Sequence, residues 1–391
     1  MPILFLIVVI DLIGFGITIP LLPFYAEHYQ ATPAQVGSLM AIYSVTQFIA
    51  APFWGHLSDR IGRKPVLLGS MAGAALAYIW LGTAETLLAL FAARAMAGFM
   101  AGNISTAFAY IADITTKENR AKGMGLMGAA FSIGFILGPA IGGILAGSDP
   151  ANADFRTPSF LAAGLSIAAC VLGIFILKES LSSESRARIR SQTSVARMAA
   201  LMDALKTPGI GVLLILAFLS TLVFAGLEST FAMWSRRQFD WGPEQNGYLF
   251  AFIGFLAALV QGGLMGRLAK LFSLEKLILA GAIALSVGLV CVPLVSSVPQ
   301  LVIAMTIATL GFSVMSPALN TAISVRGDAD VQGGLMGVTR STTTMSRMVG
   351  PAIAGVAFGF IGINAPYFAG SILMLLVAFI AYWSLFRSAK A

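Results

Sequence analysis

Residues 55–68 read Gly-His-Leu-Ser-Asp-Arg-Ile-Gly-Arg-Lys-Pro-Val-Leu-Leu and connect two long apolar runs, 35–54 and 66–83. Each run has about the 20 residues that an α-helix needs to cross a bilayer. The short connection between them is basic and includes Arg60 and Arg63. Short loops rich in Lys and Arg stay on the cytoplasmic side of a membrane. The stretch therefore predicts a cytoplasmic turn between two membrane-spanning helices.

The composition of the whole chain also indicates a membrane protein. Of its 391 residues, 58% are hydrophobic and 10% are charged, whereas about 25% of the residues in soluble domains are charged. The formal net charge of +7 is interpreted as an orientation signal, because the basic residues gather in alternate loops. We therefore expect no nucleic-acid partner. Cys170 and Cys291 both lie in apolar runs, so they predict neither a disulfide framework nor a zinc site.

Apolar runs separated by Gly, Pro or charged connections predict an all-α membrane protein with twelve transmembrane helices. The predicted spans are 2–25, 35–54, 65–84, 87–112, 123–146, 159–177, 208–233, 245–266, 276–296, 300–325, 331–360 and 365–386. The loops after even-numbered spans carry most of the basic residues. Both termini are therefore expected in the cytoplasm, and the chain in the inner (plasma) membrane.

A polar segment and an internal repeat divide the chain into two halves. Residues 178–207 mix Lys and Arg with Ser and Ala, which predicts a cytoplasmic linker on the membrane surface. The sequence Gly-Pro-Ala-Ile-Gly-Gly at 138–143 returns as Gly-Pro-Ala-Ile-Ala-Gly at 350–355. We therefore predict two pseudo-symmetric six-helix bundles, 1–177 and 208–391, with a substrate cavity at their interface near the middle of the membrane.

The opening stretch resembles the loop motif of the major facilitator superfamily, a class of membrane transporters. Its G-x-L-x-D-R-x-G-R-K-x-x-x-L spacing is matched by Gly55, Leu57, Asp59, Arg60, Gly62, Arg63, Lys64 and Leu68. An ordinary basic loop explains the arginines but not the spacing of the glycines and the aspartate. The resemblance implies the major facilitator fold and a conformational latch. In that latch Asp59 meets the cytoplasmic end of the eleventh helix, and Arg63 meets Asp113 at the end of the fourth. The candidate latch residues are Gly55, Asp59, Arg60, Gly62, Arg63 and Asp113.

The fifth span carries a string of small residues and a proline. These are Gly134, Gly138, Pro139, Gly142 and Gly143. Small residues four apart allow a neighbouring helix to pack closely, and a proline inside a helix favours a bend. A single G-x3-G pair is ordinary membrane packing. The whole string resembles the fifth-helix motif of proton-coupled exporters in this superfamily, which implies export in exchange for protons.

Ionisable residues inside membrane spans are costly and often functional. A D-x-x-G-x-G-x-x-x-P-x-x-P string begins at Asp11 and resembles the first helix of tetracycline efflux proteins and other twelve-span drug exporters. Arg94 lies in L-x3-R-x3-G-x3-G, which resembles the family's fourth-helix motif, where the arginine is linked to proton transfer. Glu228 is the other acid placed inside a span. We predict that Asp11, Arg94 and Glu228 couple transport to protons. The alternatives are that Arg94 extends outward to the interface and that Glu228 is an interfacial acid.

Polar residues in several spans are candidates for the substrate cavity. Arg340 and Arg347 lie two turns apart on one face of the eleventh span, with Thr344 between them. The buried arginines outnumber the buried acids, which favours an anionic or zwitterionic substrate, or contact with lipid phosphate. The candidate cavity residues are Gln47, Asn103, Asn320, Arg340, Thr344 and Arg347.

The motifs together resemble those of twelve-span drug:proton antiporters, and the match is strongest over residues 11–143. We expect a monomeric exporter of a small organic compound, such as a drug or another xenobiotic, that works by alternating access and contacts membrane lipid. The alternatives are an exporter of a native metabolite (a sugar, an amino acid derivative or a siderophore) and a non-transporting receptor or scaffold of the same fold.

The energy source and the substrate are constrained by what the sequence lacks. No phosphate-binding loop, nucleophile–base pair or set of metal ligands is found in it. We therefore expect neither an enzyme, nor a metal site, nor a cofactor, and we expect the proton gradient to drive transport. Tetracycline exporters carry an aspartate in the ninth helix, whereas residues 276–296 contain no acid. This departure from the family pattern favours a substrate other than tetracycline.

Overall fold

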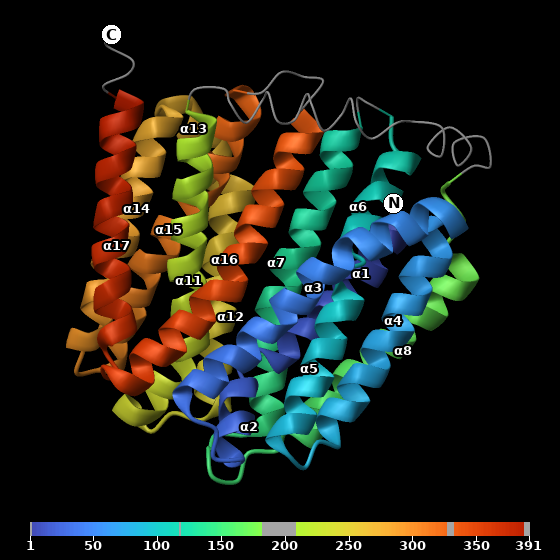
Figure 1. The fold of residues 1–391 in the computed structure, drawn as a ribbon, viewed down its shortest axis with the longest axis horizontal. Helices are drawn as coiled ribbons and strands as arrows, with labels where there is room; N and C mark the ends of the chain where they lie inside the picture. The colour runs from blue at the N-terminus through green and yellow to red at the C-terminus, as the bar shows by residue number, and fades with distance from the viewer. Residues whose placement is uncertain (1, 117–118, 182–208, 327–331, 387–391) are drawn as a thin grey trace. The chain divides into compact units, whose positions relative to one another are not determined.

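The protein is all-α over the part of the chain that the structure, a computed structural model, describes: residues 2–116, 119–181, 209–326 and 332–386 (Figure 1). The prediction of the fold class is therefore confirmed. The helices are α1 Pro2–Thr18, α2 Leu22–His28, α3 Pro33–Ile61, α4 Arg63–Gly82, α5 Leu87–Ala101, α6 Ile104–Ile114, α7 Arg120–Ala146, α8 Arg156–Ile176, α11 Ile210–Phe239, α12 Pro243–Leu259, η1 Val260–Leu264, α13 Met265–Leu271, α14 Leu274–Cys291, η2 Val292–Leu294, α15 Val298–Arg326, α16 Gln332–Phe360, α17 Ala365–Ala381 and η3 Tyr382–Phe386.

Most of these helices are built to cross a membrane. Within the described ranges, 11 helical segments are long and apolar enough to do so, and they match the predicted spans one to ten and twelve. The predicted eleventh span is α16, whose 29 residues are sufficient in length but include many polar side chains. Large apolar side chains face outward, such as Phe175 at 82% and Phe360 at 83% exposure. Lipid accommodates such a surface, whereas water does not.

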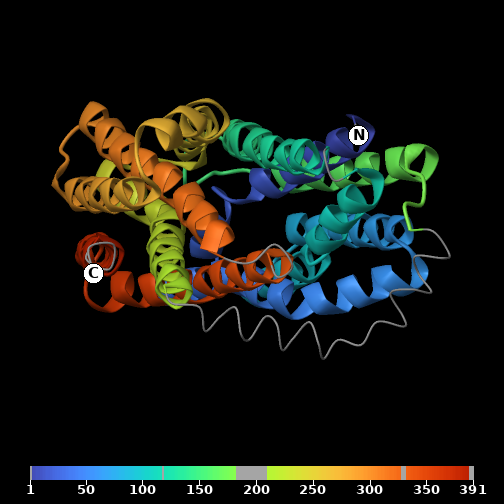
Figure 2. The ribbon, with the colours of Figure 1, turned by 90° about the horizontal axis from the view of Figure 1, so that it is seen from above.

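The described residues form two compact units. The first contains α1 to α8 together with Ala232–Gly254, where α11 ends and α12 begins. In this unit α1 packs on α7 and α8, and α4 packs on α5 and α8 (Figure 1). In the second unit α14 packs on α15 and α17 (Figure 2). The division into domains 1–177 and 208–391 stays a prediction. The predicted linker 178–207 lies outside the described residues from residue 182 onward.

The connection between α3 and α4 is shorter than predicted. Helix α3 continues to Ile61 and α4 begins at Arg63, so Gly62 alone lies between them. Gly62 has a φ of 111°, a conformation that glycine adopts without the clash a Cβ would cause. The hydropathy pattern predicted that the second span ends where the charged residues begin. The helix nevertheless continues through the charged residues, where Asp59 pairs with Arg63 at 2.6 Å.

Two predicted spans are interrupted. The first is divided into α1 and α2 around Pro20, which has no N–H to donate. The fourth is divided into α5 and α6 at Gly102 and Asn103. Their N–H groups bond to carbonyls three residues back, each at 3.3 Å, which is the tighter 3₁₀ pattern.

Candidate functional site

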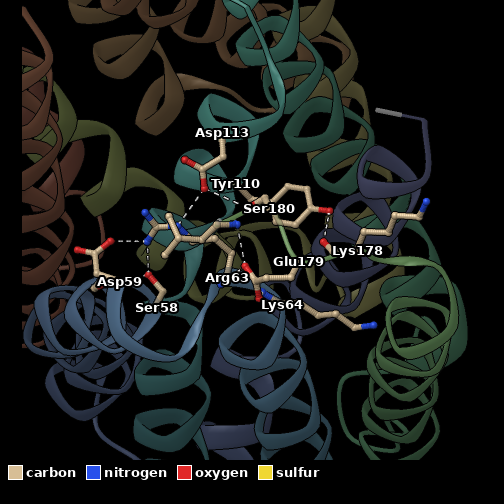
Figure 3. A network of polar contacts seen from close by, with 11 residues as sticks. Ser58, Asp59, Arg63, Lys64, Tyr110, Asp113, Lys178, Glu179 and Ser180 are labelled. Atoms are coloured by element: carbon tan, nitrogen blue, oxygen red, sulfur yellow. Dashed lines mark hydrogen bonds and ion pairs between the residues drawn. The ribbon is translucent and has the colours of Figure 1, made fainter. Parts of the chain in front are cut away.

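Arg63 is the centre of a polar network at the junction of α3 and α4 (Figure 3). Its side chain is only 7% exposed. The Nη1 group donates to Asp59 Oδ1 and to Ser58 Oγ, both at 2.6 Å, and Nε donates to Asp113 Oδ2 at 3.2 Å. Two carboxylates and a hydroxyl thus satisfy donors of a buried guanidinium. The contact expected between Arg63 and Asp113 is present.

The other candidate latch residues have different environments. Gly62 provides the turn described above, whereas a Cβ added at Gly55 would meet nothing within 4 Å. Arg60 is exposed at the end of α3. The predicted partner of Asp59, the start of the eleventh helix near residue 331, lies outside the described residues. The latch therefore stays a prediction on that side, and the described part is the network around Arg63.

Sequence reasoning missed Glu179, which joins this network from the segment after α8. Its carboxylate accepts hydrogen bonds from the backbone N–H groups of Arg63 and Lys64. In the sequence Glu179 stands 116 residues from Arg63, at the start of the segment interpreted as a solvated linker. Its position directly after the sixth span was visible, but no spacing pattern connected it with the second and third spans.

Arg94 is buried in the first unit, with 3% exposure. Its guanidinium carbon lies 4.3 Å from the ring centre of Tyr43 and 5.7 Å from that of Phe15. An arginine over aromatic faces is stabilised by cation–π attraction, which strengthens where water is excluded. The side chain therefore does not extend outward to an interface, which was the alternative to a buried role.

Asp11 and Arg94 lie around the same buried tyrosine. Tyr78 of α4 is 4% exposed and within electrostatic range of Asp11, Arg94 and Tyr43. Asp11 itself is half-buried on α1, and the Ser166 side chain of α8 is its polar neighbour. Tyr78 is thus a buried residue that both predicted proton-coupling residues affect electrostatically, and sequence reasoning did not identify it.

The glycines of α7 allow backbones to touch. A Cβ added at Gly134 would lie 2.6 Å from the Leu12 Cβ of α1, and one at Gly138 would lie 2.5 Å from the Gly16 Cα. Gly142 likewise abuts the backbone of Ile17 of α1.

Two further members of this string, Gly143 and Pro139, face α12. A Cβ on Gly143 would lie 2.6 Å from the Pro243 carbonyl oxygen. The Pro139 carbonyl oxygen would lie 2.5 Å from a Cβ on Gly247 of α12. The string is therefore a packing surface for two helices, and any side chain there would force backbones apart.

Glu228 and Arg347 form an ion pair within the second unit. Arg347 Nη1 of α16 lies 3.3 Å from Glu228 Oε2 of α11. The glutamate side chain is 15% exposed and the arginine side chain 40%. A candidate proton-coupling residue and a candidate cavity residue therefore neutralise each other.

The remaining candidate cavity residues are spread over both units. On α16, Arg340 is exposed and its carbonyl accepts a hydrogen bond from Thr344 Oγ1 at 2.9 Å. Asn320 is exposed on α15. In the first unit Gln47 Nε2 donates to the Ala101 carbonyl at 3.3 Å, and Asn103 Nδ2 donates to Ser70 Oγ.

The partners of Gln47 and Asn103 give both residues a structural task. Gln47 binds a carbonyl at the end of α5, and Asn103 itself lies in the break before α6. Broken helices leave backbone groups that side chains must satisfy. Gln47 therefore satisfies a carbonyl at the interruption of the fourth span, and Asn103 connects the interruption to Ser70 of α4. Their place in a substrate cavity stays a prediction.

A second buried carboxylate in the first unit binds two arginines. Glu27 of α2, 10% exposed, lies 3.0 Å from Arg236 and 2.9 Å from Arg237 at the end of α11. A shared carboxylate of this kind connects α2 with α11 inside the unit. Across the described ranges, no group of three His, Cys, Asp or Glu side chains is arranged to hold a metal ion.

The family is decided by comparison with known sequences. The model of the Major Facilitator Superfamily matches residues 4–338 and 255–391. The chain belongs to this superfamily. Its fold is the major facilitator fold, with two bundles of helices, and the family consists of transporters rather than enzymes.

Several known proteins resemble the chain over nearly its whole length. The tetracycline resistance protein, class C, of Escherichia coli is 33% identical over 352 residues, which cover 88% of this chain and 86% of that protein. Multidrug resistance protein 2 of Bacillus subtilis is 28% identical and covers 95% and 92%. The crystal structure of the human organic anion transporter MFSD10 (TETRAN) has a TM-score of 0.72 at 24% identity, covering 97% and 98%. This last likeness shows the fold alone.

Proposed function

We propose that this transporter exports a drug or another xenobiotic in exchange for protons, by alternating access. One observation carries the proposal: the glycine face of α7 packs on the part of α1 that holds Asp11. Gly134 touches Leu12, the residue next to Asp11 in the chain. Movement of α7 along α1 would therefore act directly on the surroundings of the candidate proton carrier.

The cluster around Asp11 is suited to a protonation switch. An ionised carboxylate away from water is costly unless it is paired, so binding or loss of a proton changes the energy of the site strongly. Tyr78 lies within electrostatic range of Asp11 and would respond to that change of charge. Glu228 and Arg347 form an ion pair in the second unit.

The relatives support a xenobiotic substrate. Two of them are a tetracycline resistance protein and a multidrug resistance protein. The ninth span begins earlier than predicted and includes Glu275 in the first turn of α14, but residues 276–296 contain no acid. This favours a compound other than tetracycline for this chain. The proposal also includes an inner (plasma) membrane location, cytoplasmic termini, a monomeric state, contact with lipid, and a proton gradient without a cofactor.

The experiment is a screen of cells that overproduce the chain. Growth is measured against tetracycline, ethidium and a panel of other antibacterial compounds, and exported metabolites are measured in the medium. The proposal predicts resistance to at least one compound, lost when Asp11→Asn is produced at the same level. Unchanged resistance to the whole panel, together with release of a sugar, amino acid derivative or siderophore, would instead support metabolite export.

A further inference from the structure

Helix α4 begins without a capping side chain of its own. The residue before it is Gly62, and no side chain at that position bonds to the helix. The first N–H groups of any helix have no partner inside it, and they carry the positive end of the helix dipole. Here those groups belong to Arg63 and Lys64, the residues on which the latch motif depends.

Glu179 provides the missing cap from a distant part of the chain (Figure 3). Its Oε1 accepts from the Arg63 N–H at 2.8 Å and from the Leu181 N–H at 3.0 Å. Its Oε2 accepts from the Lys64 N–H at 3.1 Å. Both oxygens of the carboxylate are thus engaged, and a negative charge lies at the positive end of α4.

The neighbours of Glu179 bind the other side of the same network. Ser180 Oγ donates to Asp113 Oδ2 at 3.0 Å, the oxygen that also receives Arg63 Nε. Tyr110 of α6 donates to the Lys178 carbonyl at 2.7 Å. We call residues Lys178–Leu181 the strap. The strap therefore holds the backbone of Arg63 and the carboxylate of Asp113 at the same time.

We propose that Glu179 is a positioning residue for the latch: by capping α4 it sets the place from which Arg63 reaches Asp59 and Asp113. Arg63 is then fixed at its backbone by Glu179 and at its guanidinium by the two aspartates. The end of α8 is thereby coupled to the start of α4 through the strap. This inference rests on the proposed function only in assigning a purpose to the latch, because its test requires no substrate.

The two oxygens of Glu179 make Glu179→Gln an informative change. The amide oxygen of glutamine can still accept from Arg63, but its NH₂ group cannot accept from the Lys64 N–H. The variant also removes the negative charge at the helix terminus. Glu85→Gln is the matched control, because Glu85 is 80% exposed and its one ion pair, with Arg156, is long at 3.9 Å.

The first measurement is hydrogen exchange of the purified full chain in lipid nanodiscs. Glu179→Gln is expected to accelerate exchange of the Lys64 amide about tenfold, a factor that corresponds to ~1.4 kcal/mol, and that of the Arg63 amide by a smaller factor. Glu85→Gln is expected to leave them at the wild-type rate. Wild-type protection of both amides in Glu179→Gln would overturn the proposal.

The second measurement separates positioning from general stabilisation. Thermal unfolding is compared for the wild type, Asp113→Asn, Glu179→Gln and the double variant. In the described part of the chain Glu179 shares no hydrogen bond with Asp113, so a merely structural role predicts additive effects. A positioning role predicts that Asp113→Asn lowers the stability to unfolding less in the Glu179→Gln background than in the wild type, because Glu179 no longer fixes Arg63. Additive effects would contradict the proposal.

A variant that keeps the charge covers the case in which Glu179→Gln does not accumulate. Glu179→Asp is one methylene shorter and should reach one amide but not both. Faster exchange at Arg63 or Lys64 supports the proposal, and unchanged exchange at both opposes it. Because neither measurement involves transport, failure of the drug screen would leave these results interpretable.

Discussion

Asp11 lies on α1 at the point where three features of the first unit meet. The neighbouring Leu12 touches Gly134 of α7, Ser166 of α8 is the polar neighbour of the carboxyl, and Tyr78 of α4 lies within electrostatic range. A proton that binds there alters the charge seen by three other helices. At the scale of one residue, this is the strongest candidate for the coupling of protons to movement.

Asp11→Asn should abolish uptake driven by a pH gradient in inverted membrane vesicles, because asparagine cannot carry the proton. The protein should still reach the membrane, since the two side chains have nearly the same size. Uptake of a compound identified in the resistance screen is measured with and without the gradient. Gradient-driven uptake near the wild-type rate would exclude Asp11 and make Glu228 the leading candidate.

The pair formed by Glu228 and Arg347 is expected to matter for stability as well as transport. Glu228→Gln leaves the partly buried Arg347 without its carboxylate, at a cost of roughly 1–2 kcal/mol, between the values for exposed and buried pairs. Thermal unfolding in detergent measures this loss. The swapped protein, with Glu228→Arg and Arg347→Glu together, should recover part of it. No recovery in the swapped protein would indicate that the pair contributes little.

At the scale of helices, the glycines of α7 determine how closely α1 can approach. Gly142→Leu places a side chain against the backbone of Ile17, and such overpacking typically costs about 1–3 kcal/mol. We expect efflux to fall and single cysteines at the predicted cavity positions to react with reagents applied from both sides of the membrane.

A glycine on the same helix provides the control. A Cβ added at Gly128 meets nothing within 4 Å, so Gly128→Leu should stabilise the helix by up to ~1 kcal/mol and leave efflux intact. If Gly142→Leu and Gly128→Leu gave the same efflux and the same cysteine labelling, close packing of α7 on α1 would not explain the effect of Gly142→Leu.

The sequence predicted helices well where apolar runs are long, and less well where charges or glycines decide the ends. Periodicity and length located the spans. The extension of α3 to Ile61 was missed, because hydropathy cannot recognise that Asp59 pairs with Arg63 and so lets the helix continue. The interruption at Gly102 and Asn103 was missed because side chains from other helices satisfy its backbone groups, as Gln47 does.

The same limit applies to the candidate site. The pairing of Arg63 with Asp113 was predicted through the family motif, whereas Glu179 and Tyr78 were not predicted at all. Glu179 reaches Arg63 across 116 residues, and Tyr78 comes within electrostatic range of Asp11 only in the folded first unit. Interactions of this kind follow from tertiary structure, and a single sequence carries no periodic signal for them.

At the scale of the molecule, the latch is expected to control the balance of conformations rather than the affinity for substrate. Asp59→Asn removes one carboxylate from Arg63, and a loss of ~1.4 kcal/mol would change the inward-open to outward-open ratio about tenfold. Transport should slow while the binding constant stays near normal. Double electron–electron resonance should show a shift toward the inward-open state, and distance distributions identical to wild type would exclude the latch.

The proposed function requires that a proton gradient alone drives this chain to move a xenobiotic across the membrane. The most direct test uses purified protein in liposomes that are acidic inside, without ATP, and follows a labelled compound to which the overproducing cells become resistant. We expect accumulation against the concentration gradient of the compound, abolished by a protonophore and by Asp11→Asn. Accumulation that persists without a pH difference, or none at all from active protein, would contradict it.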